Sequence, residues 1–374
     1  MSAEGTLIID AQVFQSEAWD RGMGKYSLHF LEALLNQPGF PYKKAVVIFN
    51  KNLKLQPTAE ETLRQKLSNV EFVWLDLKLP KMVPREKLEP LLDANTKILD
   101  KFIAEQGKIK PSFIILAPFI DSLCSVFPTN VEKIALVYDL IPLLYSERYS
   151  KSHMYQNYLQ RFQLLLGADK LLTISQTVAD DVAVYTGIDP AKITNIDGAP
   201  IHREGLTPQK PDIELPANYF IMPSGDELRK NNFRAVEAFE EYRKASGNMD
   251  SRLVLTSHFQ PKTQKALNSL SSALIFSGNV SEAELLWLYQ NAVATVFVSE
   301  YEGLGLPVLE AVETGKPVVC SNLTVFNEMS SSAFYYADEQ NVASITETLQ
   351  RAAASQDFAA KRKEYPAILK RYTW

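Results

Sequence analysis

Short apolar runs alternate with longer polar or amphipathic stretches along almost the whole chain. In the first half, runs suited to strands lie at residues 7–10, 45–49, 70–75, 113–116, 134–138 and 171–174. In the second half they lie at residues 219–222, 253–256, 273–276, 294–298 and 317–320. Between the first two runs, residues 26–35 have the apolar spacing of one helix face. Strands that alternate with helices predict an α/β fold of two doubly wound parallel sheets in series.

The length of the chain agrees with this division. A chain of 374 residues is too long for one ordinary core and suits two domains. Within a polar stretch at residues 198–216, six glycine and proline residues punctuate the sequence, namely Gly198, Pro200, Gly205, Pro208, Pro211 and Pro216. We therefore predict an N-terminal domain at residues 1–205 and a C-terminal domain at residues 206–374.

Charge and cysteine content exclude several classes of protein. The net charge is −5, with 23 basic and 24 acidic residues up to residue 205, and 16 basic and 20 acidic residues after it. Neither half has the basic surplus of a nucleic-acid-binding surface, so no nucleic-acid partner is expected. Cys124, Cys320 and the four histidines are scattered, which argues against a disulfide framework or a metal site. Since no apolar run is long enough for a membrane span and residues 1–5 do not resemble a signal peptide, we expect a cytoplasmic protein.

The most specific chemical signal is a pair of glutamates, Glu302 and Glu310, separated by seven residues. The segment at residues 299–311 reads Ser-Glu-Tyr-Glu-Gly-Leu-Gly-Leu-Pro-Val-Leu-Glu-Ala and follows the apolar run 294–298. Pro307 suits the first turn of a helix, so the glycines are expected at a strand-to-helix junction. Such a junction offers backbone N–H groups and the positive end of a helix to a phosphate or a sugar hydroxyl.

A second signal follows the first strand of the predicted second domain. Residues 223–232 read Pro-Ser-Gly-Asp-Glu-Leu-Arg-Lys-Asn-Asn. The guanidinium of Arg229 can bind a phosphate through paired N–H donors, and Lys230 adds a compact charge, so the pair suits a diphosphate. An isolated Arg-Lys pair is usually a solvated surface feature; its place after a strand favours the functional interpretation. Residues 276–281 form another strand-end loop before a helix, which is a weaker signal.

At the Glu-x7-Glu pair and its glycine-rich context, the chain resembles the retaining glycosyltransferases of family 4 (group 1). These are related to glycogen synthase, sucrose synthase and bacterial polysaccharide glycosyltransferases. The resemblance implies the GT-B fold, in which two Rossmann-like doubly wound domains face each other across a cleft and the second domain binds the nucleotide sugar. It covers nearly the whole chain, more strongly from about residue 219 onward.

The resemblance also implies roles for individual residues. Glu302 would face the donor sugar and act in catalysis with Arg229 and Lys230, which would neutralise the leaving nucleoside diphosphate. Glu310 would bind the ribose. The remaining donor-binding positions of the second domain would be Gly225, Asn279, Val280, Gly303, Leu304, Gly305 and Leu306, with Asn279 and Val280 at the nucleobase.

In the first domain, Gly22-Met23-Gly24 resembles the glycine loop that contacts the donor phosphate. Glycine permits the close backbone approach and positive φ that such a loop needs. A dinucleotide fingerprint is excluded because it would need glycine where Ser27 stands, whereas a plain turn remains open. Asp139 is a further candidate for donor binding. Tyr138 stands where many family members have histidine, which indicates either a subgroup in which Tyr138 or Asp139 replaces it or a weakened site.

These observations predict a retaining hexosyltransferase of polysaccharide biosynthesis. It would move a sugar from a nucleotide-diphosphate sugar to a hydroxyl of a glycan or lipid-linked glycan. Neither a cofactor nor a metal is expected, because the chain lacks Asp-x-Asp and Arg229 and Lys230 can supply positive charge. Two alternatives are a catalytically weak nucleotide-sugar-binding subunit that needs a partner and a GT-B-like epimerase. The base, the sugar, the acceptor and the oligomeric state stay open.

Two further segments concern contact with a membrane and the extent of the polypeptide. Residues 78–110 hold eight basic and five acidic residues, which fits either an ordinary solvated face or peripheral contact with the inner face of a membrane. The last residues, Tyr372-Thr373-Trp374, resemble the Phe-Ser-Trp that precedes a final helix in the family. Either the chain is truncated there or it is the leading module of a longer polypeptide.

Overall fold

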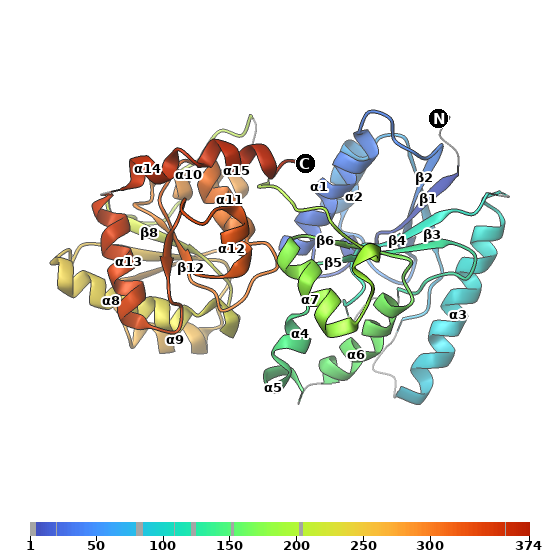
Figure 1. Ribbon diagram of the computed structural model, residues 1–374, viewed down its shortest axis with the longest axis horizontal. Coiled ribbons are helices and arrows are strands. Elements are labelled where there is room, and N and C mark those ends of the chain that lie inside the picture. The colour runs from blue at the N-terminus through green and yellow to red at the C-terminus, as the bar shows by residue number, and fades with distance from the viewer. Residues whose placement is uncertain are drawn as a thin grey trace. The chain divides into compact units, whose positions relative to one another are not determined.

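The computed structural model describes residues 5–19, 21–79, 85–107, 109–120, 125–150, 153–201, 205–355 and 357–374. Cys124 and parts of the predicted linker and of the basic region lie outside these residues. The chain divides into two compact units, Met1–Gly198 together with Trp374, and Ala199–Thr373. Each unit is built on its own sheet with helices on both faces (Figure 1).

The first unit contains a seven-stranded sheet in the order β3-β2-β1-β4-β5-β6-β7, and each pairing between neighbours is parallel. The strands are β1 (Thr6–Asp10), β2 (Lys44–Asn50), β3 (Val70–Leu75), β4 (Ser112–Ile115), β5 (Glu132–Val137), β6 (Lys170–Thr173) and β7 (Ile193–Asn195). Parallel strands buried on both faces read as continuous apolar runs, which is why six of them were predicted. The seventh, β7, has only three residues and is half-buried, so it gave no such signal.

The helices of the first unit connect these strands. They are α1 (Gly22–Asn36), α2 (Pro57–Lys66), α3 (Arg85–Ala104), α4 (Ile141–Leu144), α5 (Ser146–Tyr149), α6 (His153–Leu166) and α7 (Gln176–Thr186), with the 3-10 helices η1 (Gln12–Gln15) and η2 (Pro190–Lys192). On one face of the sheet, Leu99, Phe102 and Ile103 of α3 pack into a core with Ile8 and Val46. Helix α7 begins at Ser175, whose hydroxyl accepts a hydrogen bond from Val178 N, as an N-cap does.

The second unit contains a six-stranded sheet in the order β10-β9-β8-β11-β12-β13, also parallel at each pairing. The strands are β8 (Tyr219–Pro223), β9 (Arg252–Thr256), β10 (Leu274–Gly278), β11 (Thr295–Phe297), β12 (Val318–Ser321) and β13 (Tyr335–Ala337). Five of these were predicted. The sixth, β13, is a three-residue strand at the edge of the sheet.

Helices cover both faces of the second sheet. They are α8 (Asn232–Ser246), α9 (Pro261–Asn268), α10 (Glu282–Asn291), α11 (Leu306–Glu313), α12 (Thr324–Met329), α13 (Val342–Ala354), α14 (Phe358–Arg362) and α15 (Tyr365–Arg371), with the 3-10 helix η3 (Leu228–Lys230). Helices α8 and α13 pack against each other and share one core with the strands, including Phe220 and Phe239. Helix α11 contacts α15, and Phe326 of α12 packs on Phe297 of β11 at 6.0 Å between ring centroids.

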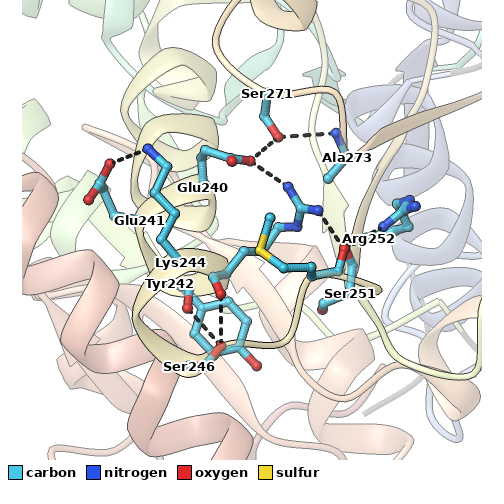
Figure 2. A network of polar contacts seen from close by, with 11 residues as sticks. Glu240, Glu241, Tyr242, Lys244, Ser246, Ser251, Arg252, Ser271 and Ala273 are labelled. Atoms are coloured by element: carbon cyan, nitrogen blue, oxygen red, sulfur yellow. Dashed lines mark hydrogen bonds and ion pairs between the residues drawn. The ribbon is translucent and has the colours of Figure 1, made fainter.

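A polar network fixes the C-terminal end of α8 to the beginning of two strands (Figure 2). Arg243 donates hydrogen bonds to Glu240 Oε2 at 2.7 Å and to Met249 O at 2.5 Å. Ser271 Oγ donates to the same Glu240 oxygen at 2.6 Å and accepts from Ala273 N at 3.1 Å. Because β9 begins at Arg252 and β10 at Leu274, this network lies at the amino ends of the strands. The network has a structural role. It lies at the amino ends of the strands, whereas the residues predicted to bind the donor follow their carboxyl ends.

The predicted fold class is confirmed at the level of the two units: each is a doubly wound parallel α/β sheet. Among the described helices, none combines the length and the apolar character that crossing a membrane requires.

Candidate functional site

The two predicted motifs of the second unit meet at the carboxyl ends of its central strands. Strand β8 leads through residues 224–227 into η3, which contains Arg229 and Lys230. Strand β11 leads into the segment that contains Glu302. Because β8 and β11 are neighbours in the sheet, both segments emerge at the same edge, where open α/β sheets bind ligands.

Arg229, Lys230 and Glu302 form one buried ionic cluster, which we call the charged trio. Arg229 NH1 lies 2.8 Å from Glu302 Oε1, and Lys230 Nζ lies 2.7 Å from the same oxygen. The three side chains are 15%, 13% and 9% exposed. The sequence predicted these three residues as one catalytic group, and the structure brings them together across more than seventy residues of chain.

Burial and charge act in opposite directions on the ionisation of the trio. Burial alone would raise the pKa of Glu302, but the positive charges of Arg229 and Lys230 outweigh it and hold that pKa below its ordinary value. For Lys230, burial and the nearby guanidinium of Arg229 lower the pKa despite the Glu302 carboxylate. The carboxylate is therefore held ionised, and the two cations are held in a desolvated site. The side chain of Glu227 also contacts Arg229, with 2.8 Å between Glu227 Oε2 and Arg229 Nε, from a half-exposed position.

Backbone and amide contacts fix the position of the cation-bearing turn. Asn231 adopts a left-handed backbone conformation with φ of 58°, and its side-chain amide donates to Val298 O at 3.0 Å and to Glu339 O at 2.7 Å. Glu300 N donates to Arg229 O at 2.8 Å, which joins the two motifs directly. Arg234 NH1 adds an ion pair with Glu300 Oε1 at 3.2 Å. These contacts hold both motifs in register, so the trio is preorganised by neighbouring groups.

The loop before the cations is also braced. Asn232 Nδ2 donates to Gly225 O at 2.8 Å, and Ser224 Oγ contacts Asn232 Oδ1 at 2.8 Å. A Cβ atom at Gly225 would meet nothing within 4 Å, so close packing does not require a glycine there. The open space beside Gly225 is consistent with the predicted approach of a donor, which stays a prediction.

The glycine-rich turn after Glu302 forms the start of α11. Gly305 caps the helix with φ of +88°, and a Cβ atom there would lie 2.4 Å from Cε1 of the buried Phe326 ring. Pro307 occupies the first turn, as predicted. Leu304 is buried, while the backbone of Gly303 and Leu306 lies at the junction that was predicted to contact sugar and phosphate.

Glu310 lies inside α11 and is 5% exposed. The hydroxyl of Tyr289, on α10, donates a hydrogen bond to Glu310 Oε2 at 2.8 Å. The sequence analysis did not identify Tyr289, because a tyrosine on a buried helix face has no signature that separates it from a core residue. The ribose-binding role of Glu310 stays a prediction, with its carboxylate oriented by a buried phenol.

Asn279 and Val280 follow β10 at the same edge of the sheet as the charged trio. Gly278 precedes them with φ of +66°, and Ser281 then begins α10 with a capping box to Glu284. Strand β10 is three positions from β11 in the sheet, which corresponds to about 14 Å at the usual strand spacing. The order of the strands therefore separates the predicted base contacts from the predicted sugar contacts along the carboxyl ends of one sheet, and both sets stay predictions.

In the first unit, the predicted glycine loop is instead the first turn of a helix. Gly22 and Gly24 belong to α1, and neither has a positive φ, so the expectation of a left-handed loop was wrong. Gly24 packs closely against its own chain instead, because a Cβ atom there would lie 2.4 Å from Ala18 O and 2.5 Å from Trp19 O, and a role of the two glycines in donor binding stays a prediction. The chain bends back on itself before α1, and Gly24 N donates to Ala18 O at 3.0 Å.

Tyr138, at the position of the family histidine, is turned toward this helix. Its hydroxyl lies 2.6 Å from Ser27 Oγ and donates to Met23 O at 3.3 Å. Burial raises the pKa of the Tyr138 phenol, so it stays protonated near neutral pH. The adjacent Asp139 accepts a hydrogen bond from Ile141 N at 3.0 Å at the beginning of α4. Tyr138 thus joins the end of β5 to the glycine-containing turn.

The chain is similar to known proteins both in its second unit and along almost its whole length. Residues 206–367 match the family model of glycosyl transferases group 1. The serotype-specific mannosyltransferase WbdA of Escherichia coli is 24% identical over 98% of this chain and 46% of its own length. The O-antigen chain mannosyltransferase RfbU of Salmonella typhimurium is 25% identical over 62% of this chain and 64% of its own length. The chain spans about half or less of the length of WbdA.

Among solved structures, Anabaena Alr3699/HepE in complex with UDP and glucose aligns with a TM-score of 0.65. The alignment covers 99% of this chain and 95% of that chain at 14% identity. Likeness at this level concerns the fold, and it confirms the predicted pair of Rossmann-like domains of GT-B type.

Proposed function

We propose that the chain, whose residues 206–367 match the family model of glycosyl transferases group 1, transfers a sugar from a nucleotide-diphosphate donor to a hydroxyl of a glycan or lipid-linked glycan. The observation that carries the proposal is the charged trio, because two cations and a carboxylate meet at the ligand-binding edge of the matched unit. The names of WbdA and RfbU support mannose as the sugar and a bacterial surface polysaccharide as the acceptor. Activity at the cytoplasmic face of a membrane belongs to the same proposal.

The proposed reaction uses the trio to stabilise the departing diphosphate. The bond between the anomeric carbon and the phosphate oxygen breaks, and its electron pair stays on the diphosphate, where Arg229 and Lys230 offset the growing charge. The acceptor hydroxyl attacks the anomeric carbon on the face from which the diphosphate departs and passes its proton to the leaving phosphate oxygen. The configuration at the anomeric carbon is therefore retained. Glu302 orients the sugar, and Glu310, held by Tyr289, binds the ribose. Neither a resident cofactor nor a metal ion is needed in this scheme.

A direct test is the release of nucleoside diphosphate from GDP-mannose, UDP-glucose and ADP-glucose, with and without glycan acceptors and with and without EDTA. Arg229→Ala combined with Lys230→Ala is expected to lower kcat by at least about a hundredfold, as loss of preorganised charge stabilisation does. Lys262→Ala combined with Lys265→Ala removes two exposed lysines from α9 and is the matched control. Unchanged turnover in the Arg229/Lys230 variant would contradict the proposal. Release of nucleoside diphosphate only with acceptor excludes an epimerase, and NMR of the product determines its anomeric configuration.

The second candidate function is a nucleotide-sugar-binding subunit that needs a partner for catalysis. Tyr138 favours this alternative, because its phenol is engaged by Ser27 where many relatives of the family carry histidine. Binding of one nucleotide sugar without turnover on any acceptor would support it.

A further inference from the structure

The charged trio contains its own anion. Both cations point at the same carboxylate oxygen, Glu302 Oε1, at 2.8 Å and 2.7 Å. The Glu302 side chain is 9% exposed, so little water screens these charges. The Asn231 side chain and Glu300 N fix the backbone of the turn that carries both cations.

A diphosphate that binds Arg229 and Lys230 therefore meets a negative charge already in place. Its oxygens must approach N–H groups that lie beside the Glu302 carboxylate, and like charges repel strongly in a desolvated site. The diphosphate must either share these donors with the carboxylate or displace it. In both cases its affinity is lower than two buried cations alone would give.

We infer that Glu302 is an internal counter-ion of Arg229 and Lys230 that competes with the diphosphate, so that the site distinguishes the intact sugar donor from the spent nucleoside diphosphate. This inference rests on the proposed function. A donor brings a sugar whose hydroxyls donate hydrogen bonds to the carboxylate and draw it away from the cations. Once the sugar has been transferred, this compensation is lost. Glu302 then turns back to Arg229 and Lys230 and promotes release of the product.

The test measures the affinity of inorganic pyrophosphate, which carries the diphosphate charge but no sugar and no base. Isothermal titration calorimetry compares the whole chain with its Glu302→Gln variant, in which the shape is kept and the charge is removed. We expect pyrophosphate to bind about tenfold more tightly to the variant, equivalent to about 1.4 kcal/mol. Glu302→Asp moves the carboxylate back by one methylene, and we expect a smaller gain of about threefold because charge repulsion falls with distance.

Glu240→Gln is the matched control, because Glu240 is 17% exposed and pairs with an arginine, Arg243, but lies at the amino ends of the strands, away from the charged trio. It should change pyrophosphate affinity less than twofold. Circular dichroism checks the folding of each variant. If Glu302→Gln fails to fold, Glu302→Asp still tests the inference, because it retains the negative charge that pairs with the buried cations. Affinity equal to or weaker than that of the unaltered chain in the folded Glu302 variants would overturn the inference.

A third variant separates this inference from the proposed function. Arg229→Ala combined with Lys230→Ala should abolish pyrophosphate binding. If it does so while the Glu302 variants gain nothing, the phosphate site stands and the counter-ion inference fails. If the double variant binds pyrophosphate as well as the unaltered chain does, the phosphate assignment itself fails. With a donor identified, Glu302→Gln should also bind the nucleoside diphosphate more tightly relative to the nucleotide sugar.

Discussion

Replacing Gly305 with alanine tests whether the glycine-rich turn is built by packing. Gly305 has φ of +88°, a conformation that costs a non-glycine residue about 1–2 kcal/mol. The new Cβ atom would also lie 2.4 Å from Cε1 of Phe326, a ring with 0% exposure that has no free space to move into. Overpacking of this kind costs about 1–3 kcal/mol. We therefore expect Gly305→Ala to destabilise the second unit by about 2–5 kcal/mol.

Differential scanning calorimetry of the whole chain measures this loss in the unfolding transition of the second unit. For a unit of about 175 residues, each kcal/mol shifts the midpoint by about 2–4 °C, so a shift of about 4–20 °C is expected. Gly247→Ala is the matched control, because Gly247 has φ of +70° in the same unit but nothing within 4 Å of a new Cβ atom. It should lose only about 1–2 kcal/mol.

The Phe326 ring provides the decisive comparison. In a Phe326→Leu background the atom that clashes is gone, so Gly305→Ala should cost less there than in the unaltered chain, by about 1 kcal/mol or more. Equal losses for Gly305→Ala and Gly247→Ala, or an unchanged cost in the Phe326→Leu background, would refute the packing argument. Gly305→Ala should also weaken the binding of nucleoside diphosphate, because a shift of Gly305 displaces the first turn of α11.

Three further predictions follow from buried hydrogen bonds. Tyr289→Phe removes the hydroxyl that holds Glu310 and should weaken nucleoside diphosphate binding about fivefold or more in calorimetry while leaving pyrophosphate affinity unchanged. Ser271→Ala removes a hydrogen bond to Glu240 and should cost about 1 kcal/mol of stability without changing ligand affinity. Burial raises the pKa of Glu240, but its bonds to Ser271 and Arg243 outweigh burial and keep the pKa below its ordinary value of 4.5. The ionised Glu240 therefore stabilises the fold above about pH 4.5, and this stabilisation is lost as the pH falls further. Urea titrations at several pH values should show that Ser271→Ala loses less stability in acid than the unaltered chain does. Tyr138→Phe should lower the melting temperature, with a cost of about 1 kcal/mol, whereas an unchanged midpoint would contradict a positioning role for the Tyr138 phenol.

The fold could be predicted from sequence because most of its strands are apolar along their length, whether they are buried on both faces or half-buried like the edge strands β3 and β10. Such strands appear as continuous apolar runs, and eleven of them gave the two doubly wound sheets. Strands β7 and β13 were missed because they have three residues each and lie outside any longer apolar run, whereas the equally short β11 lies within the apolar run 294–298. Gly22 and Gly24 were misjudged for a related reason: a glycine permits both a positive φ and a close approach, and only the folded backbone shows which one is used.

The sequence by itself predicted which residues could carry the chemistry, since residue type, spacing and the resemblance to family 4 pointed to Glu302, Glu310, Arg229 and Lys230. Only the tertiary structure decided how they meet. Neighbouring positions of β8 and β11 in the sheet bring Glu302 against both cations, and the fold brings the Tyr289 hydroxyl of α10 to Glu310 of α11. A local pattern encodes the period and the ends of each element, but the order of strands in a sheet depends on contacts between distant segments. For that reason the candidate residues of the site could be predicted from the sequence, whereas the pairing of Glu302 with both cations, from which its counter-ion role is inferred, could not.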